Sequence, residues 1–250
     1  MQVFAGSPSV HKLPGSGGWL FSHDFFGSSY RLRGLNNTVQ VLHSPDGVEW
    51  SLRSNVTKIY WANLFAIPAG SGAGDSWGVA TGEVVYLMGT HGDDFKITSP
   101  PNTVPMKGGP VVISKSTDSG RSWTEPVVLL HGSFQTAPTP VINVNNTLFR
   151  SMEDSSVPGV GAFVMWAKAD SNLLDPAAWS RSSSTVPQTH CTQHGTCLQE
   201  GSVIEAPSGE VWNLLRVNTQ TISWHNKLAI AVLDVPELCS IASANCPDRV

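Results

Sequence analysis

The sequence has little charge and no long apolar run. Only 14% of its 250 residues are charged, and the formal net charge is −4. No basic stripe is visible, and the net charge argues against a nucleic-acid surface. No apolar stretch reaches the roughly 20 residues that a membrane-spanning helix needs. Helical periodicity persists nowhere for three turns, which excludes a helical domain.

The motifs of two common repeat families are also missing. There is no Trp-Asp dipeptide, and the Gly-Gly pairs at 17–18 and 108–109 are isolated, which disfavours WD40 and Kelch repeats. What the chain does have is 23 Gly and 17 Pro, which fit many short strands joined by turns, and nine Trp. We therefore predict an all-β chain of hairpins, with indole faces available to pack blades or stack on sugar rings.

Signals for cellular location point in two directions. Residues 1–18 contain no signal-peptide pattern. Glycosylation sequons nevertheless begin at Asn36, Asn55 and Asn145. The sequons favour an extracellular or secretory-pathway protein.

All four cysteines fall in the last quarter of the chain. They form two close pairs, each bracketing a short loop, which suits local disulfides in a secreted protein. A metal site would add His190 and His194, but the spacing matches no common zinc pattern. We therefore expect disulfides or free thiols, with neither a metal nor a cofactor. The four are Cys191, Cys197, Cys239 and Cys246.

The stretch Ser116–Trp123 matches the pattern S-x-D-x-G-x-x-W at every fixed position. An Asp such as Asp118 caps a tight turn by accepting backbone N–H bonds. Gly120 supplies a backbone angle that other residues resist, and the indole of Trp123 returns to cover an apolar face. β-Branched runs of strand length flank the motif, so it predicts a strand, an Asp-capped turn and a strand.

A looser copy runs from Ser44 through Asp46 and Gly47 to Trp50, one residue shorter between Asp and Gly. Both stretches resemble the Asp-box, or BNR repeat, of the sialidase-like propeller superfamily. The resemblance implies a six-bladed β-propeller and a structural role for the box residues. Residues 175–179 look like a degenerate element of the same kind, a turn followed by Trp.

The resemblance also sets the expected domain boundaries. We expect an N-terminal extension at 1–18, the propeller at 19–235 and an irregular tail at 236–250. The hairpins supply material for about four or five blades of 40–50 residues each. The ring would then be incomplete, and its open sheet edge would invite pairing with another chain.

The stretch from Glu200 to Arg216 places two opposite charges around a turn. A hairpin symmetric about Ser208 puts Glu200 opposite Arg216, so the two side chains meet at one end of a blade. The plain alternative is a surface cross-strand pair of little energetic weight. The stretch also resembles the sialidase segment whose Glu polarises a tyrosine nucleophile and whose Arg helps to clamp the substrate carboxylate. The resemblance implies Glu200 as a catalytic residue and Arg216 as a substrate contact.

Two further candidates lie at the ends of predicted strands. Asp24 precedes the first box by twenty residues, and the family takes an aspartate general acid from this region. The alternative is a turn-capping Asp. Arg150 ends another predicted inner strand and is a candidate substrate contact, against the alternative of a solvated strand-end arginine.

Other features of the family are missing. The first arginine is Arg31, so the family's Arg-Ile-Pro segment has no counterpart. The tyrosine nucleophile and the third clamp arginine should follow the Glu–Arg hairpin, but Tyr86 is the last tyrosine and only 34 residues follow Arg216. The first hypothesis is a glycoside hydrolase of the exo-alpha-sialidase type for acidic glycans, or an inactive descendant. A non-catalytic carbohydrate-binding propeller and a protein-interaction scaffold are the alternatives. The expected partner is a glycan or glycoconjugate.

Overall fold

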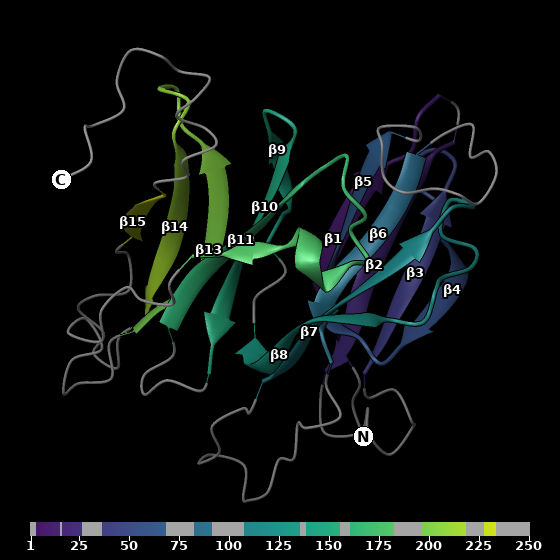
Figure 1. Ribbon diagram of the computed structural model, residues 1–250. Helices are drawn as coiled ribbons and strands as arrows, with labels where there is room; N and C mark the ends of the chain where they lie inside the picture. Colours follow the sequence, from purple (N-terminus) through teal and green to yellow (C-terminus); the bar gives the residue numbers. More distant parts are fainter. Residues whose placement is uncertain are drawn as a thin grey trace, which may run out of the picture.

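The computed structural model of the chain is built from antiparallel strands (Figure 1). It describes residues 4–15, 17–26, 37–68, 83–91, 108–135, 139–155, 161–182, 197–218 and 228–233. Within these ranges the one helical element is the short 3-10 helix η2 (Pro176–Ala178). The predicted all-β class is confirmed. No helix in the described ranges is long and apolar enough to cross a membrane.

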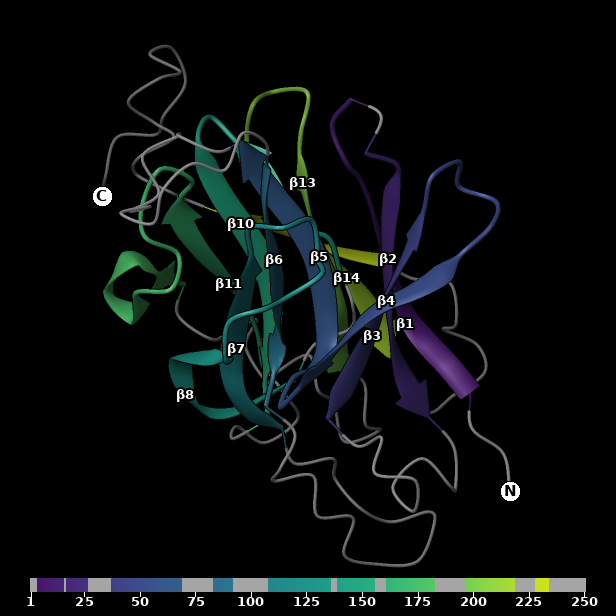
Figure 2. The same cartoon turned by 90° about the vertical axis from the view of Figure 1, so that its right-hand side faces the viewer.

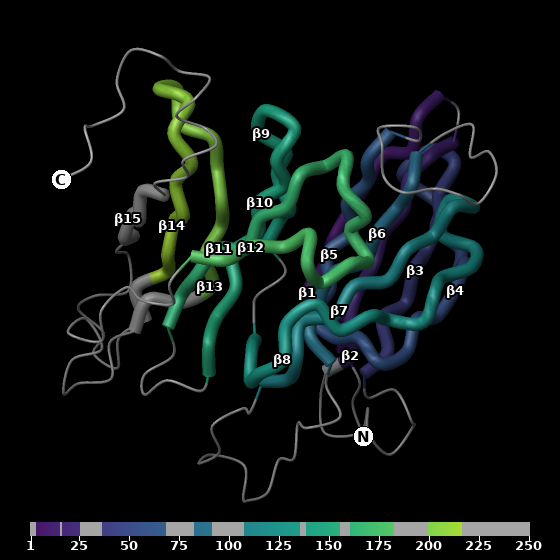
Figure 3. Tube along the Cα trace, viewed as in Figure 1, coloured from purple at the N-terminus to yellow at the C-terminus, as the bar shows by residue number. Residues whose placement is uncertain are grey.

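The described strands form four successive groups, which follow one another from right to left in Figure 1 and along the tube in Figure 3. The first blade is β1 (Phe4–Lys12), β2 (Trp19–Phe26), β3 (Thr38–Ser44) and β4 (Ser51–Thr57). The second is β5 (Tyr60–Pro68), β6 (Glu83–Thr90), β7 (Gly109–Ser116) and β8 (Val127–Gln135). The third is β9 (Ile142–Val144), β10 (Thr147–Asp154), β11 (Gly161–Lys168) and β12 (Ser180–Arg181). The fourth is β13 (Cys197–Glu205), β14 (Val211–Asn218) and β15 (Leu228–Leu233).

The second and third blades share hydrogen-bonded strands. β8 pairs with β7 from Val127 to Phe134, with two register shifts, and its last two residues also pair with the end of β10. Seen from the side in Figure 2, β5 of the second blade lies beside the first blade. The first and fourth blades are separate sheets, and no described strand of one pairs with the other.

Apolar side chains fill the spaces between consecutive blades. Leu20 and Val41 of the first blade pack with Leu87 of the second. Met88, the next residue along β6, points to the other side and packs with Met152 of the third blade. This alternation buries both faces of the inner blades, because successive side chains of a strand point to opposite faces. A smaller cluster, containing Phe149 and Val203, joins the third blade to the fourth.

The sheet begins earlier than the expected boundary at residue 19. β1 lies inside the segment that we expected to be an extension, and it pairs with β2 along the edge of the first blade. Its register shifts between Gly6 and Ser9, where Ser7 has a φ of +52°. The bulge and Pro8 interrupt the alternation of apolar residues, so the sequence pattern does not reveal the strand. The expected tail at 236–250 lies outside the described residues.

Several sequence expectations concern other parts of the chain. Asn145 and Asn146 form the tight turn between β9 and β10, with φ values of +49° and +61° that suit a two-residue hairpin. The predicted hairpin is confirmed. Cys197 opens β13, while Cys191, Cys239 and Cys246 lie outside the described ranges. No group of three or more metal-binding side chains occurs among the residues described.

The two turns that resemble Asp-boxes, Ser44–Trp50 and Ser116–Trp123, connect the third strand of a blade to the fourth. In the second box, Asp118 Oδ1 accepts the N–H groups of Arg121 and Ser122, both at 2.9 Å. Gly120 has a φ of +82°, which favours glycine. The indole N–H of Trp123 donates to Ser54 Oγ of the first blade at 3.0 Å. The turn therefore contacts the neighbouring blade as well as closing its own hairpin.

The first box and the degenerate element occupy the equivalent places in their blades. Asp46 Oδ1 accepts the N–H groups of Val48 and Glu49, and these bonds lower the pKa of Asp46. In the third blade, Asp175 caps η2 by accepting the Ala177 N–H at 2.9 Å. Three blades thus share a side-chain-capped turn before their last strand.

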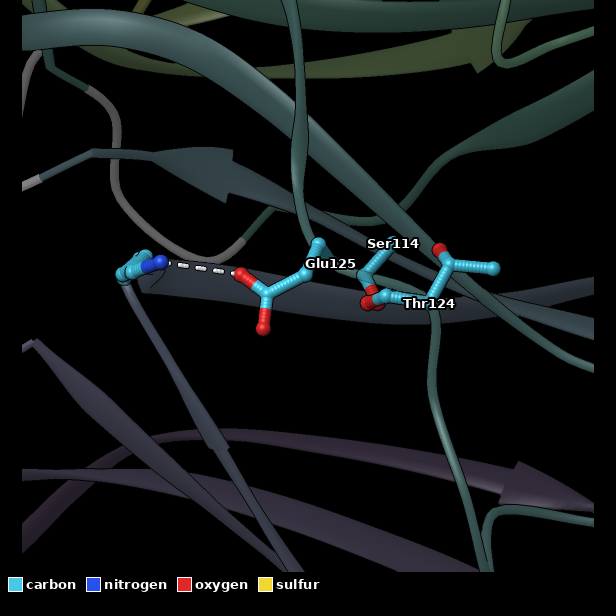
Figure 4. A network of polar contacts seen from close by, with 4 residues as sticks. Ser114, Thr124 and Glu125 are labelled. Atoms are coloured by element: carbon cyan, nitrogen blue, oxygen red, sulfur yellow. Dashed lines mark hydrogen bonds and ion pairs between the residues drawn. The ribbon is translucent and has the colours of Figure 1, made fainter.

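Polar contacts beside the second box also join strands and blades (Figure 4). Ser114 Oγ donates to the carbonyl oxygen of Thr124 at 2.7 Å. Glu125 accepts from Nζ of Lys58, in the connection between β4 and β5, at 2.9 Å. Because both side chains of this ion pair are well exposed, it adds little stability, and the buried interface between the blades does more.

The outer face of the first blade is apolar and open. Val10 is opposite Phe21, Phe21 is opposite Leu42, and Leu42 is opposite Leu52, so the four side chains share one face. Val10 is 54% exposed and Leu52 is 56% exposed. The corresponding faces of the later blades are covered by the preceding blade.

We predict that Asp118→Ala lowers the free energy of unfolding by about 1 kcal/mol or more, through lost turn hydrogen bonds, without changing ligand affinity. Burial opposes ionisation of Asp118, but bonds from Ser122, Ser116 and Arg121 outweigh it and lower the pKa. The bonds therefore stabilise the fold above the unfolded pKa, and their contribution is lost as the pH falls through the lower folded pKa. Denaturant melts should show the wild-type advantage at pH 7 and its progressive loss as the pH falls through the lowered folded pKa of Asp118. An advantage that persists at the lowest pH would contradict this.

We also predict that the chain self-associates. Exposed apolar faces and sheet edges favour pairing with another chain. Sedimentation should give a mass above that of a monomer, and the double substitution Val10→Lys and Leu52→Lys should shift the distribution toward monomer. A wild-type chain that sediments as a stable monomer at every concentration would contradict the prediction.

Candidate functional site

Glu200 and Arg216 form an ion pair in the fourth blade. Arg216 Nη1 lies 2.5 Å from Glu200 Oε2, and the two side chains are 51% and 40% exposed. The pair is therefore accessible to a ligand. Among the described residues Glu200 is the one ion-pair partner of this guanidinium, whose further N–H groups suit a planar, bidentate partner such as a carboxylate.

The pair forms although the register differs from the expected one. From Ser202 to Glu205 the hairpin is symmetric about Ser208, as predicted. The register then shifts by one, and Gln199 rather than Glu200 lies opposite Arg216. Glu200 and Gly201 form a bulge facing the single residue Leu215. The bulge keeps the carboxylate of Glu200 within reach of Arg216.

The bulge fits closely against its neighbours. Glu200 has a φ of +49°, a conformation that costs free energy in a residue with a side chain. A Cβ at position 201 would collide with Ser151 Oγ and Asn213 Oδ1, so only glycine fits there. Asn213 is 2% exposed, and its Oδ1 has no hydrogen-bond partner among the described residues.

Glu153 contacts this bulge, although sequence reasoning did not single it out. Glu153 lies on β10 and is 4% exposed. Its Oε1 accepts the backbone N–H of Glu200. The pKa of Glu153 is raised, mainly by burial and in part by the Glu200 carboxylate. Hydrogen bonds from the Glu200 N–H and the Gln135 side chain, together with the charge of Arg216, oppose this rise.

Arg150 lies on the opposite face of β10 and is fully buried. Its Nη1 donates to the Met88 carbonyl oxygen, and its Nη2 donates to the Trp61 carbonyl oxygen at 3.1 Å and to Asn63 Oδ1 at 3.3 Å. Burial lowers the pKa of Arg150 to about 9, partly offset by Asp24, so the guanidinium stays protonated at neutral pH. In this structure its contacts join β10 to β5 and β6, and its predicted role in substrate binding stays a prediction.

Asp24 lies near Arg150 and apart from the Glu200–Arg216 pair. It is 1% exposed, and neither carboxylate oxygen makes a hydrogen bond of normal geometry among the described residues. Burial raises the pKa of Asp24 well above its usual range, while the nearby Trp61 N–H and Arg150 lower it in part. No ion pair or hydrogen bond in the described ranges links it to Glu200 or Arg216. Its role as a catalytic acid also stays a prediction.

A repeated feature relates the two buried acids. β5 has a bulge at Trp61 and Ala62, where Trp61 has a φ of +49°, as β13 has one at Glu200 and Gly201. Asp24, on the second strand of the first blade, lies at the Trp61 N–H. Glu153, on β10 of the third blade, lies at the Glu200 N–H. An acidic side chain of the preceding blade thus lies at each bulge. This structural repeat is the signal that points to Glu153.

The structure resembles propeller proteins of known fold. A protein of unknown function from Dyadobacter fermentans aligns over 92% of this chain and 69% of its own, with a TM-score of 0.54 and 14% identity. An α-L-arabinofuranosidase from Lactobacillus brevis aligns over 91% and 72%, with a TM-score of 0.55 and 13% identity. A Hadza microbial sialidase, Hz136, aligns over 90% and 45%, with a TM-score of 0.51 and 16% identity. The chain has the sialidase-like β-propeller fold.

At these identities the likeness establishes the propeller fold and not an activity. No protein-family model matches the sequence, and a search of curated proteins finds no match. The predicted propeller is confirmed, and the described residues supply four of its blades. The function of this propeller has to be inferred from its own side chains.

We predict that Arg150→Leu destabilises the propeller by about 3–5 kcal/mol, because the buried acceptors on Met88, Trp61 and Asn63 would lose their donor. Arg181→Leu is the matched control, since Arg181 is exposed on β12 and contacts only the ring of Phe163 among the interactions described. The control should change stability by about 1 kcal/mol or less. Chemical denaturation of the two variants checks this, and equal losses would show that burial of Arg150 is not the cause.

Proposed function

We propose that this chain is a sialidase-like glycosidase propeller whose site binds an acidic glycan through Glu200 and Arg216. The observation that carries the proposal is the half-exposed ion pair held at a bulge of the fourth blade. Arg216 offers its remaining N–H groups to the carboxylate of the sugar. Glu200 lies beside it as the group that handles a proton or a nucleophile.

A glycan ligand agrees with the structural neighbours. The proteins named above include an α-L-arabinofuranosidase and a sialidase, and both names describe action on sugars. An acidic sugar is the finer proposal, and it rests on the guanidinium of Arg216. Asp24 would serve as the acid only if the site opens toward it, because it is almost fully buried.

Binding without hydrolysis is the second candidate function. The two tyrosines in the described ranges are Tyr60 and Tyr86, and both are buried. Tyr60 donates its hydroxyl hydrogen to the Phe25 carbonyl oxygen, and Tyr86 stacks on Phe65. Neither supplies the nucleophile that sialidases use in place of a carboxylate. This observation favours a carbohydrate-binding propeller.

We also propose an extracellular or secretory-pathway location. Asn55 on β4 and Asn145 at the β9–β10 turn are exposed, so both sequons are open to glycosylation. Their positions on the outermost strand of a blade and on a hairpin tip leave room for a glycan.

We predict that Arg216→Lys weakens binding of N-acetylneuraminic acid by about tenfold, because an ammonium cannot replace a bidentate guanidinium fork. Binding of galactose, a neutral sugar, should stay within about twofold by the same reasoning. Titration calorimetry measures both, with Arg181→Lys as the control. Equal losses for both sugars would show that Arg216 is structural or serves another group.

A fluorogenic sialoside separates the two candidate functions. Turnover by the wild-type chain that Glu200→Gln abolishes would establish hydrolysis. Sugar binding without turnover would leave the carbohydrate-binding candidate, which is the result that the buried tyrosines favour.

A further inference from the structure

At the bulge, the backbone N–H of Glu200 has no partner in the β13–β14 ladder. A bulge leaves its extra residue without a ladder partner, and a buried N–H without an acceptor is costly. Glu153 supplies the acceptor from the preceding blade. The bond therefore links the backbone of the site to a side chain outside it.

The position of Glu153 is fixed by its own surroundings. Its backbone pairs with Gln135 at the end of β8, and the Gln135 side chain bonds to its carboxylate. All eight residues of β10 are buried. Glu153 thus presents its carboxylate to β13 from a fully buried strand.

A similar arrangement occurs in the second blade, where Asp24 of the preceding blade lies near the bulge at Trp61. In both places a left-handed residue in the first strand of a blade meets an acid from the blade before it. The two places differ in one respect. Position 61 carries an apolar side chain, whereas position 200 carries the carboxylate that pairs with Arg216.

We propose that Glu153 is a positioning residue for the site. It holds Glu200 in the bulged, left-handed conformation, and this conformation brings the carboxylate of Glu200 to Arg216. Without the acceptor, β13 would relax toward a regular strand, and the Glu200 carboxylate would leave Arg216. The part that concerns sugar binding rests on the proposed function.

The first test needs no ligand. We expect the amide proton of Glu200 to be slow in hydrogen exchange and its resonance to shift with pH as Glu153 titrates. Within the described ranges the charged groups that act on Glu153 are Glu200 and Arg216, so the shift should also be followed in E200Q, which removes the nearby carboxylate. In E153Q the amide should stay protected, because a carbonyl acceptor remains, but the shift with pH should vanish. An amide of residue 200 that exchanges freely, or that titrates unchanged in E153Q, would overturn the proposal.

The second test uses the site. E153M removes the acceptor at similar size and should weaken N-acetylneuraminic acid binding about tenfold, whereas E153Q should stay within about threefold of the wild type. E205Q and E205M, at an exposed glutamate of the same hairpin, are the matched controls and should change nothing. If E153M does not fold, the amide measurements on the wild type, E200Q and E153Q decide the question alone.

The two proposals fail in different ways. A wild-type chain that shows the Glu200–Glu153 coupling but binds no acidic sugar would overturn the proposed function and leave the positioning role intact. Sugar binding that E153M and E153Q leave equally unchanged would overturn the positioning role and leave the proposed function intact.

Discussion

Charge buried on one strand constrains this whole propeller. Every residue of β10 is buried, yet the strand carries Arg150, Glu153 and Asp154. A buried charge is tolerated only where partners satisfy it, so the surrounding blades must present those partners in fixed places. Arg150 donates hydrogen bonds to carbonyl oxygens of β5 and β6, and Glu153 accepts one from a backbone N–H of β13. The polar contacts of one strand thereby fix the relative positions of three blades that apolar packing alone would hold less specifically.

The same constraint determines where the backbone of the site bends. Bulges at Trp61 and Glu200 release backbone groups from the ladders, and buried acids of neighbouring blades lie at the released N–H groups. At Trp61 the freed carbonyl oxygen also serves Arg150. At Glu200 the result is a half-exposed carboxylate paired with a guanidinium. Strain stored at one residue and offset by its neighbours is typical of functional sites.

The sequence predicts the parts of this structure that depend on nearby residues. The hydrogen bonds of the Asp118 turn join residues no more than four apart, so an eight-residue sequence motif is enough to predict it. The Asn145–Asn146 turn and the hairpin around Ser208 are equally local. What escaped prediction depends on other blades. β1 contains a bulge that breaks its pattern, the bulge at Glu200 packs on Ser151, and the burial of Asp24 and Arg150 follows from how the blades stack.

The same division between local and long-range contacts holds for the candidate site. The meeting of Glu200 and Arg216 followed from hairpin symmetry, although a bulge changed the residues that face each other. Glu153 was not found because its contact lies 47 residues away in sequence, and only the spatial repeat of Asp24 and Trp61 reveals it. Long-range contacts of this kind leave no periodic signal in a single sequence.

A crystal structure of the protein with N-acetylneuraminic acid tests the central claim most directly. The account predicts the ligand carboxylate about 2.8 Å from the guanidinium of Arg216, with the N–H of Glu200 still bonded to Glu153. A ligand bound away from Arg216, or a β13 strand running without its bulge and with Glu200 directly opposite Arg216, would contradict it.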